Sequence, residues 1–207
     1  MFLNLLNAYL KDRPASQLNA FNAYLMLLNK WNKAYNLTAI HDPHNMVILH
    51  ILDSLSIEPY LKGNHIIDIG TGAGLPGMIL AIANPDKQFT LLDSNGKKTR
   101  FLFQAKVELH LDNVEIVNER AEKFHNTACF DTIVTRAFAT IDTMLEKTKH
   151  LCCEDGQFLA MKGEAPLEEL KNISDDFEVK AIHQLTIPHL KAQRHLVCIK
   201  GKGAKRT

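Results

Sequence analysis

Four closely spaced glycines constrain the fold of this 207-residue chain more than any other feature. They are Gly70, Gly72, Gly74 and Gly77. A short β-branched run, 66–69, precedes them and is typical of a buried strand. An apolar stretch of helix formers, 78–83, follows, and Pro76 stands where the first turn of a helix tolerates a missing N–H. Glycine lets a ligand approach the main chain without meeting a Cβ, so strand, loop and helix in this order predict a ligand site at the carboxyl edge of a parallel sheet.

Asp68 favours one class of ligand for this loop. Gly72, Gly74 and Gly77 also match the dinucleotide pattern G-x-G-x-x-G, which is a weak signal on its own. A carboxylate two residues before the first glycine would crowd the phosphates of a dinucleotide, but it suits the cationic sulfonium and amino group of S-adenosylmethionine. A tight turn without a ligand is the remaining alternative, although four glycines cost more backbone entropy than such a turn requires.

Size and composition fit one α/β domain with a modest extension. The chain is 46% hydrophobic and 23% charged with a net charge of +1, so the global balance gives no sign of nucleic-acid binding. The N-terminus lacks the basic region of a signal peptide, and no apolar run approaches the ~20 residues of a membrane span. We therefore expect a cytoplasmic protein without a membrane segment.

The cysteines and histidines predict neither a nucleophile nor a metal site. The cysteines form no C-x-x-C pair, so we expect free or buried thiols in a reducing compartment. His41, His44 and His50 are close in sequence, but a proline lies among them and no cysteine is near, so we expect no bound metal. The four cysteines are Cys129, Cys152, Cys153 and Cys198.

Residues 1–62 are expected to form a helical extension packed on the core. Apolar residues recur at helical spacing in 2–10 and in 18–31. Trp31 and Tyr35 are expected to be packing residues, with a stacking role as the alternative.

A further helix is predicted from Pro43 towards Leu55, because Asp42 is a good N-cap and proline suits the first helical position. In this helix His50 and Asp53 are three residues apart and share a face. They form either a capped surface pair or a pocket wall that faces the glycine loop.

Residues 63–200 carry the α/β pattern, with further strands predicted at 88–93, 114–117, 130–135 and 156–162 and helices at 97–110 and 141–150. Asp93 ends the second strand roughly 20 residues after the loop, the spacing at which a carboxylate meets a ribose. Residues 118–122 follow the third strand, where an adenine edge would lie. Arg136 follows the fourth strand and is a candidate for the crevice, with a solvent-facing loop charge as the alternative.

The last two strands, 177–187 and 195–200, are joined through Pro188 without room for a helix, so they must pair as an antiparallel hairpin. The dinucleotide fold ends in a helical crossover, and this topology therefore favours a methyltransferase independently of the loop. The basic tail 201–207 is expected to be flexible and either contacts phosphates or is a solvated end.

Eight segments spread over nearly the whole chain together resemble one family. They are KWNKAYNLTAI (30–40), HILDSL (50–55), IDIGTGAGLPGMILAI (67–82), LLDSNGKKTRFL (91–102), RAE (120–122), TRAFA (135–139), KG (162–163) and RHLVCIK (194–200). On these motifs the chain is similar to the RsmG family, formerly named GidB, of bacterial small-subunit (16S) ribosomal RNA guanine-N7 methyltransferases. The resemblance implies a Rossmann-like class I methyltransferase fold, with a mostly parallel seven-stranded sheet, an antiparallel terminal hairpin and an N-terminal helical extension.

The resemblance also implies S-adenosylmethionine as the methyl donor and one guanine of small-subunit RNA, within a ribosomal particle, as the acceptor. It implies cofactor contacts from Gly70, Leu75, Ala121, Glu122 and Arg136. From the loop and the second strand end we add Asp68 at the methionine end, Asp93 at the ribose, Gly72, Gly74 and Ser94. The candidates that face RNA are Asn36, His50, Asp53, Arg120, Lys162 and Arg194.

No catalytic side chain is assigned, because guanine N7 holds an in-plane lone pair and carries no proton at neutral pH. The main task is then to position guanine N7 against the methyl group, and such positioning lowers the activation barrier by roughly 7–11 kcal/mol in favourable cases. Two other functions stay open. A ribosome-binding module with a vestigial cofactor site would bind small subunits without consuming the donor, and an NAD-dependent oxidoreductase would need a helical final crossover. We expect a monomer.

Overall fold

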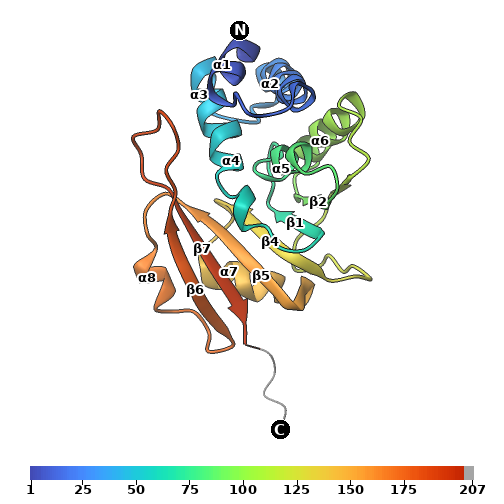
Figure 1. Ribbon diagram of the computed structural model, residues 1–207. Helices are drawn as coiled ribbons and strands as arrows, with labels where there is room; N and C mark the ends of the chain where they lie inside the picture. The colour runs from blue at the N-terminus through green and yellow to red at the C-terminus, as the bar shows by residue number, and fades with distance from the viewer. Residues whose placement is uncertain (203–207) are drawn as a thin grey trace.

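A seven-stranded sheet in the order β3-β2-β1-β4-β5-β7-β6 organises the chain, of which a computed structural model describes residues 1–202 (Figure 1). The first five strands are parallel, whereas β7 runs antiparallel to both of its neighbours. The predicted mostly parallel sheet with a terminal hairpin is therefore confirmed. The strands are β1 (His65–Ile69), β2 (Gln88–Leu92), β3 (Val114–Val117), β4 (Phe130–Arg136), β5 (Cys152–Lys162), β6 (Phe177–Gln184) and β7 (His195–Gly201).

The side chains of the strands divide the core into two apolar layers. Ile66 of β1 packs in the layer under α5 and α6, while Ile67 and Ile69 pack in the layer under α7. This division follows from the alternation of side chains along a strand, and a strand covered on both faces is apolar throughout. The helices on the two faces are α5 (Gly77–Ala83), α6 (Gly96–Glu108), α7 (Ile141–Thr148), the 3-10 turn Lys149–Leu151 and α8 (Leu167–Leu170).

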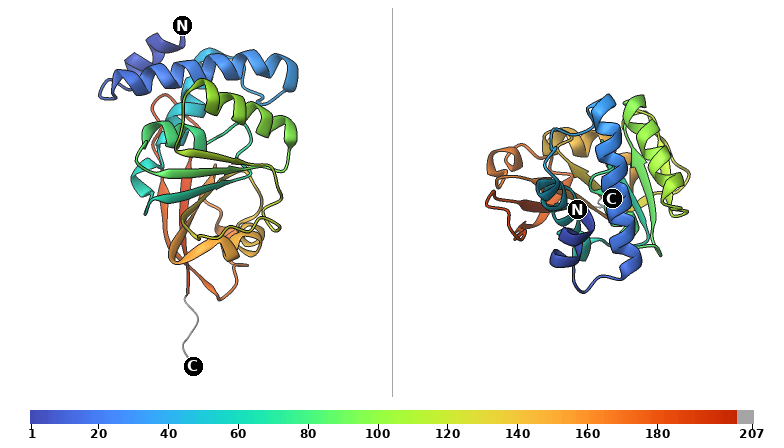
Figure 2. Two further views of the ribbon diagram at one scale, coloured as in Figure 1. Left: turned by 90° about the vertical axis from the view of Figure 1, so that its right-hand side faces the viewer. Right: turned by 90° about the horizontal axis from the view of Figure 1, so that it is seen from above.

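The N-terminal helices share one apolar cluster with α5 and α6. Figure 2 shows α2 lying along the top of the molecule beside α6. The Tyr24 hydroxyl of α2 donates a hydrogen bond of 2.6 Å to the Ala73 carbonyl and so ties this helix to the glycine loop. The elements are α1 (Phe2–Tyr9), α2 (Ala15–Tyr35), α3 (Pro43–Met46), a π-helical stretch (Val47–Leu52), α4 (Asp53–Leu55) and a 3-10 turn (Glu58–Tyr60).

Several predicted boundaries differ from the structure. The helix expected from Pro43 to Leu55 is present but is wound as a π-helix over Val47–Leu52, which apolar spacing does not reveal. Strand β5 begins at Cys152 and not at residue 156, and β6 ends at Gln184 and not at 187. Within the predicted tail, Gly201 ends β7, and residues 203–207 lie outside the described range.

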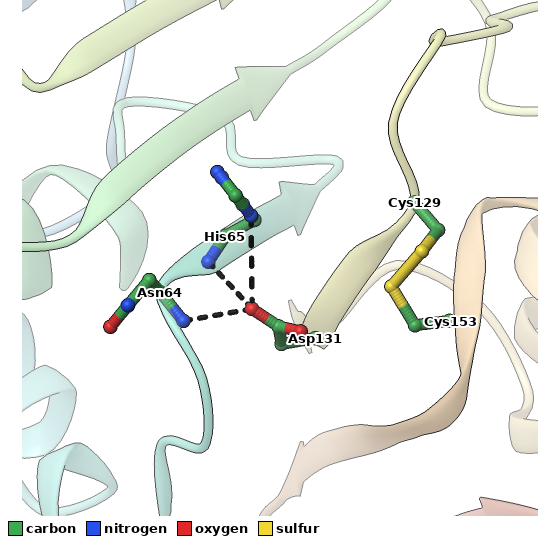
Figure 3. Close-up of a disulfide and its surroundings, with 5 residues drawn as sticks. All are labelled: Asn64, His65, Cys129, Asp131 and Cys153. Carbon is green, nitrogen blue, oxygen red and sulfur yellow. Dashed lines mark hydrogen bonds and ion pairs between the residues drawn. A yellow bond between two sulfur atoms is a disulfide. The ribbon is translucent and has the colours of Figure 1, made fainter.

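The expectation of four free thiols is wrong for two of the cysteines. Cys129 and Cys153 form a disulfide between the amino ends of β4 and β5, with Cα atoms 4.9 Å apart (Figure 3). The pairing of these strands brings together two residues that are 24 positions apart in the chain, and no spacing rule shows such a contact. Cys152 and Cys198 are free, as expected.

Asp131 holds the start of β1 in place at the same edge of the sheet as the disulfide, where the parallel strands begin (Figure 3). Its carboxylate accepts hydrogen bonds from the main-chain N–H groups of Asn64 and His65, at 2.8 and 2.9 Å. These bonds hold the pKa of Asp131 below its usual value. Among residues 1–202, no helix is long and apolar enough to cross a membrane.

Candidate active site

The glycine loop adopts the conformation for which glycine is needed. Gly70, Gly72 and Gly74 have φ angles of 68°, 62° and 92°, which other residues adopt only with strain. A Cβ placed on Gly72 would have no neighbour closer than 3.9 Å, so the main chain is open to a ligand there. Gly77 lies in the first turn of α5, where a Cβ would clash with Leu91 and Asp68. Three glycines therefore shape the loop, and the fourth allows close packing of helix on strand.

Asp68 holds the glycine loop in place through two buried hydrogen bonds. Its side chain is fully buried and accepts hydrogen bonds from the Thr71 hydroxyl at 2.6 Å and from the Gly77 N–H at 2.8 Å. Burial raises the pKa of Asp68 to about 6, although these two hydrogen bonds oppose the shift. Its Oδ1 atom has no hydrogen-bond partner within the described residues, so a free acceptor lies next to the loop.

A first cavity of about 270 Å³ lies at the carboxyl ends of β1 and β2. Asp93 forms part of its wall and accepts hydrogen bonds from the N–H groups of Gly72 (2.9 Å) and Asn95 (2.8 Å), while the Lys98 ammonium lies 3.7 Å away. These contacts hold the carboxylate in one orientation. Of the residues predicted from the sequence, this cavity is lined by Gly70, Asp93, Ser94, Arg120, Ala121 and Glu122.

A second cavity of about 470 Å³ lies beside the first, between the end of β4 and the π-helical stretch. Ala137, which has a φ of 56°, lines both cavities, so the two cavities adjoin at this residue. The predicted residues that line the second cavity are His50, Asp53, Arg136, Lys162 and Arg194.

Asp53 holds two arginines in the wall of the second cavity. It is 2% exposed, and its two oxygens accept hydrogen bonds from Arg136 Nη1 at 2.9 Å and Arg194 Nε at 3.0 Å. Arg136 Nη1 also donates to the Leu49 carbonyl at 2.9 Å. Because Arg194 precedes β7 and Arg136 ends β4, this carboxylate joins three distant parts of the chain. His50 and Asp53 therefore form a pocket wall and are not a capped surface pair, but the cavity that they line includes no residue of the glycine loop.

His50 is neutral at physiological pH. Burial and then the nearby Arg136 guanidinium lower the pKa of His50 to about 4. Its Nε2 atom is hydrogen-bonded to the Thr38 hydroxyl at 3.1 Å, and its Nδ1 atom has no hydrogen-bond partner in residues 1–202. The imidazole therefore lines the second cavity with one buried ring nitrogen that has no partner among the described residues.

The remaining predicted residues either pair with another side chain, border the other cavity or lie outside both cavities. The Lys162 ammonium lines the second cavity, but it is paired with Glu169 at 2.8 Å. Arg120 borders the first cavity instead of the second and lies 3.9 Å from Glu122. Asn36 ends α2 with a φ of 51° and is exposed. Asn36 lines neither cavity, and neither do four of the predicted cofactor residues, Asp68, Gly72, Gly74 and Leu75, while Arg136 lines the second cavity and not the first. Their assignment to the cofactor stays a prediction.

Sequence reasoning missed three residues of the site. Lys98 lies within ion-pair distance of Asp93, and its place in the segment NGKKTR, just after a strand end, was an available signal. Phe138 covers the loop, since a Cβ on Gly70 would lie 2.6 Å from its ring. The segment 136–139 was expected to leave β4 into the crevice, but neither Ala137 nor Phe138 was named as a site residue, and the positive φ of Ala137 arises from the turn that leaves β4. Among the described residues, no group of His, Cys, Asp or Glu is arranged to hold a metal ion.

A model of the GidB family, described as rRNA small subunit methyltransferase G, matches residues 17–197. This chain belongs to the GidB family. The chain is 51% identical over 189 residues to the ribosomal RNA small subunit methyltransferase G of Nitrosococcus oceani, covering 91% of this chain and 88% of that protein. It is 46% identical over 202 residues to the protein of the same name from Escherichia coli K12, covering 96% and 98%. The resemblance inferred from eight motifs is confirmed.

Solved structures confirm the Rossmann-like methyltransferase fold. Coclaurine N-methyltransferase bound to N-methylheliamine and SAH superposes with a TM-score of 0.57 at 15% identity, over 87% of this chain and 61% of that one. The ribosomal protein L11 methylase of Lactobacillus delbrueckii subsp. bulgaricus gives a TM-score of 0.56 at 16% identity, over 73% and 77%. At this identity the likeness concerns the fold. The antiparallel hairpin and the GidB family together leave no support for the oxidoreductase alternative.

S-adenosylmethionine, the predicted cofactor, is confirmed with the family. The first cavity fits it on three observations. The main chain at Gly72, which lies next to the cavity and donates to Asp93, is open to a ligand, the carboxylate of Asp93 is fixed at the end of β2, and Ala121 and Glu122 after β3 line the cavity.

Proposed function

We propose that this chain methylates N7 of one guanine in small-subunit ribosomal RNA, presented within a ribosomal particle. The meeting of two cavities at Ala137 is the observation that carries this proposal, because a methyl donor and an acceptor base must come within bonding distance. Membership of the GidB family supports the reaction class.

The first cavity binds the cofactor in this proposal. Asp93 accepts hydrogen bonds from the ribose hydroxyls, and the main chain at Ala121 and Glu122 meets the adenine edge. Asp68, which is buried beneath the glycine loop, favours the cationic methionine end through its negative charge. Bound there, S-adenosylmethionine supplies a methyl group carried on a positively charged sulfur.

The second cavity receives the guanine. Arg136 and Arg194 are fixed by Asp53, so their remaining N–H groups are oriented before the RNA arrives. Neutral His50 forms part of the cavity wall beside the base. A general base is not required, because N7 attacks with a lone pair and loses no proton. The residues orient N7 and keep water away.

Charge balance is consistent with these roles. Methylation at N7 makes the guanine cationic, and two unopposed guanidinium groups beside it would disfavour that product. Asp53 offsets one of the two positive charges, and His50 adds none because its pKa is about 4. The wall of the second cavity therefore binds the base without strongly opposing the charge that develops.

Methyl transfer from radiolabelled S-adenosylmethionine tests the proposal. Small ribosomal subunits from cells that lack this gene serve as acceptor, with naked RNA and free nucleotides alongside. We expect label on the particle as 7-methylguanosine at one position. Cofactor binding without transfer would instead favour the vestigial module.

Arg136→Ala is expected to lose most of this transfer. Lys149→Ala is the matched control, because Lys149 is exposed and pairs only with neighbouring Glu146 among the described residues. Equal activity of Arg136→Ala and the parent would contradict the role of the second cavity.

We also propose that the protein acts as a monomer in the bacterial cytoplasm, where small subunits are assembled. Sedimentation at micromolar concentration tests the monomer, and a stable dimer would contradict it.

A further inference from the structure

Two neighbouring helices carry no acidic residue on the surface that they share. The sequence has no Asp or Glu between Asp12 and Asp42, which includes all of α2, nor between Asp93 and Glu108, which includes α6 up to its last residue. The two helices lie side by side in both views of Figure 2, and Trp31 of α2 packs edge-on against Phe101 of α6 with ring centroids 5.8 Å apart. Their positive charges are therefore collected on one part of the molecule.

We name this surface the α2–α6 face and define it by exposed Lys30, Lys33, Tyr35, Lys97 and Arg100. Within residues 1–202 none of its four cations forms an ion pair, whereas Lys149, Lys171 and Lys180 each pair with a glutamate. Single exposed lysines without an ion pair, such as Lys11 and Lys123, also occur elsewhere, but the face gathers four such cations on two adjacent helices. Cations without such partners keep their full charge for an anionic ligand.

A segment away from these two helices is rich in acidic residues, although four of its carboxylates pair with lysines. Residues 154–178 contain eight Asp and Glu but only two lysines, and they include α8 and the strands around it, away from α2 and α6 in Figure 1. The net charge of +1 therefore conceals a marked separation of charge. An extended polyanion would be attracted to one side and repelled from the other.

An aromatic ring stands among these cations. Tyr35 is 39% exposed and is stacked on Trp31, with ring centroids 5.1 Å apart and an angle of 26°. Trp31 packs on the core, so it holds the Tyr35 ring in place. A fixed, exposed aromatic ring beside positive charges is suited to stacking of an unpaired nucleobase.

The α2–α6 face borders both cavities. Helix α6 starts just after Asp93, and Lys98 in its first turn lines the first cavity. The C-terminal end of α2 leads through residues 36–39 to Ile40, which lines the second cavity. A strand bound along this face is therefore close to the cavity into which its target base must turn.

We propose that the α2–α6 face binds the RNA substrate, with its four cations on backbone phosphates and an unpaired base stacked on Tyr35. This inference rests on the proposed function, since it names the surface that delivers RNA to the same site. It adds residues that lie outside both cavities.

Binding of isolated small subunits over a series of salt concentrations tests this proposal. Lys30→Gln/Lys33→Gln/Arg100→Gln removes three charges from the face, and Lys149→Gln/Lys171→Gln/Lys180→Gln removes three charges elsewhere. For the first variant we expect at least tenfold weaker binding and a slope of log affinity against log salt that is smaller by about two to three, since each phosphate contact contributes about 0.7–0.9. The control variant should keep the parent slope, and both should bind the cofactor as the parent does.

Tyr35→Ala separates stacking from charge. We expect binding of small subunits to weaken by about tenfold with an unchanged salt slope, because loss of one stacked base removes no phosphate contact. An unchanged affinity would remove Tyr35 from the proposed surface.

Equal losses in the two triple variants would show a nonspecific effect of net charge and would overturn the assignment of this face. No loss in either variant would also overturn it. The parent protein could bind small subunits with the expected slope of log affinity against log salt but transfer no methyl group. That result would contradict the proposed function but not the assignment of the α2–α6 face. A parent that binds no small subunits would contradict the face itself.

Discussion

Replacing Asp53 with asparagine tests how the second cavity is held together. The change keeps the size of the side chain but removes the charge that fixes Arg136 and Arg194. Removing one partner of a fully buried ion pair costs about 3–5 kcal/mol. The Asp53 side chain is 3% exposed, but each arginine side chain is 23% exposed, so water recovers part of the loss. We expect the free energy of unfolding to fall by about 2–3 kcal/mol.

Urea unfolding measures this loss, and Glu168→Gln is the matched control. Glu168 also pairs with a cation, Lys171, but its side chain is 85% exposed, and loss of such a pair costs about 0.5 kcal/mol or less. The dependence of the unfolding free energy on urea should be the same in all three proteins, because the surface exposed on unfolding is unchanged.

The same variant should impair methyl transfer, which needs the second cavity, without impairing cofactor binding, which we assign to the first. We expect Asp53→Asn to lose at least tenfold in methyl transfer to small subunits while it binds S-adenosylmethionine as the parent does, because Asp53 lines only the second cavity. A stability loss below 1 kcal/mol, or a loss equal to that of Glu168→Gln, would refute the reasoning that Asp53 organises this wall.

Three further predictions concern the loop and the cysteines. The pKa of Asp68 is raised from 3.8 to about 6, so ionisation of this carboxyl costs stability as the pH rises from about 4 to about 6. Asp68→Asn should therefore gain up to about 3 kcal/mol of unfolding free energy relative to the parent between pH 4 and pH 7.5 without cofactor, and a difference that does not change with pH would contradict the assignment. Gly72→Ala should cost about 1–2 kcal/mol in thermal unfolding, because its φ is 62°, and should weaken cofactor binding, whereas Gly77→Ala should be the more destabilising change, because its Cβ clashes with Leu91 and Asp68. Protein unfolded without reductant should show two reactive thiols, from Cys152 and Cys198, and reduction should lower the unfolding free energy by about 3 kcal/mol; four thiols before reduction would contradict the bridge.

Local features of this fold could be predicted from the sequence. The run that forms β1 and the hairpin of β6 and β7 depend on residue types within short segments, and both are found as expected. A positive φ, expected for all four glycines of the loop, is found at Gly70, Gly72 and Gly74 but not at Gly77, which starts α5. The pairing of Asp53 with Arg194 was not predictable, because it depends on how the N-terminal helices and the terminal hairpin pack together. The disulfide of Cys129 and Cys153 depends in the same way on the pairing of β4 with β5.

Backbone irregularities account for the rest of what the sequence did not reveal. The π-helical stretch Val47–Leu52 turns His50 and Asp53 into the cavity wall, and apolar spacing cannot distinguish its winding from that of an α-helix. Ala137 adopts a positive φ although alanine has no preference for it, because the turn after β4 imposes that angle.

The position of Arg194 near the end of the chain sets the order in which the site is completed during synthesis. All residues that line the first cavity precede residue 148, whereas the ion pair that closes the second cavity joins residues 141 positions apart. At about 5–20 residues per second, roughly 7–30 s pass between the synthesis of Asp53 and that of Arg194. A nascent chain therefore contains every side chain that lines the first cavity before it can complete the second, and on the proposed roles of the two cavities it cannot act as an enzyme until Arg194 has been synthesised.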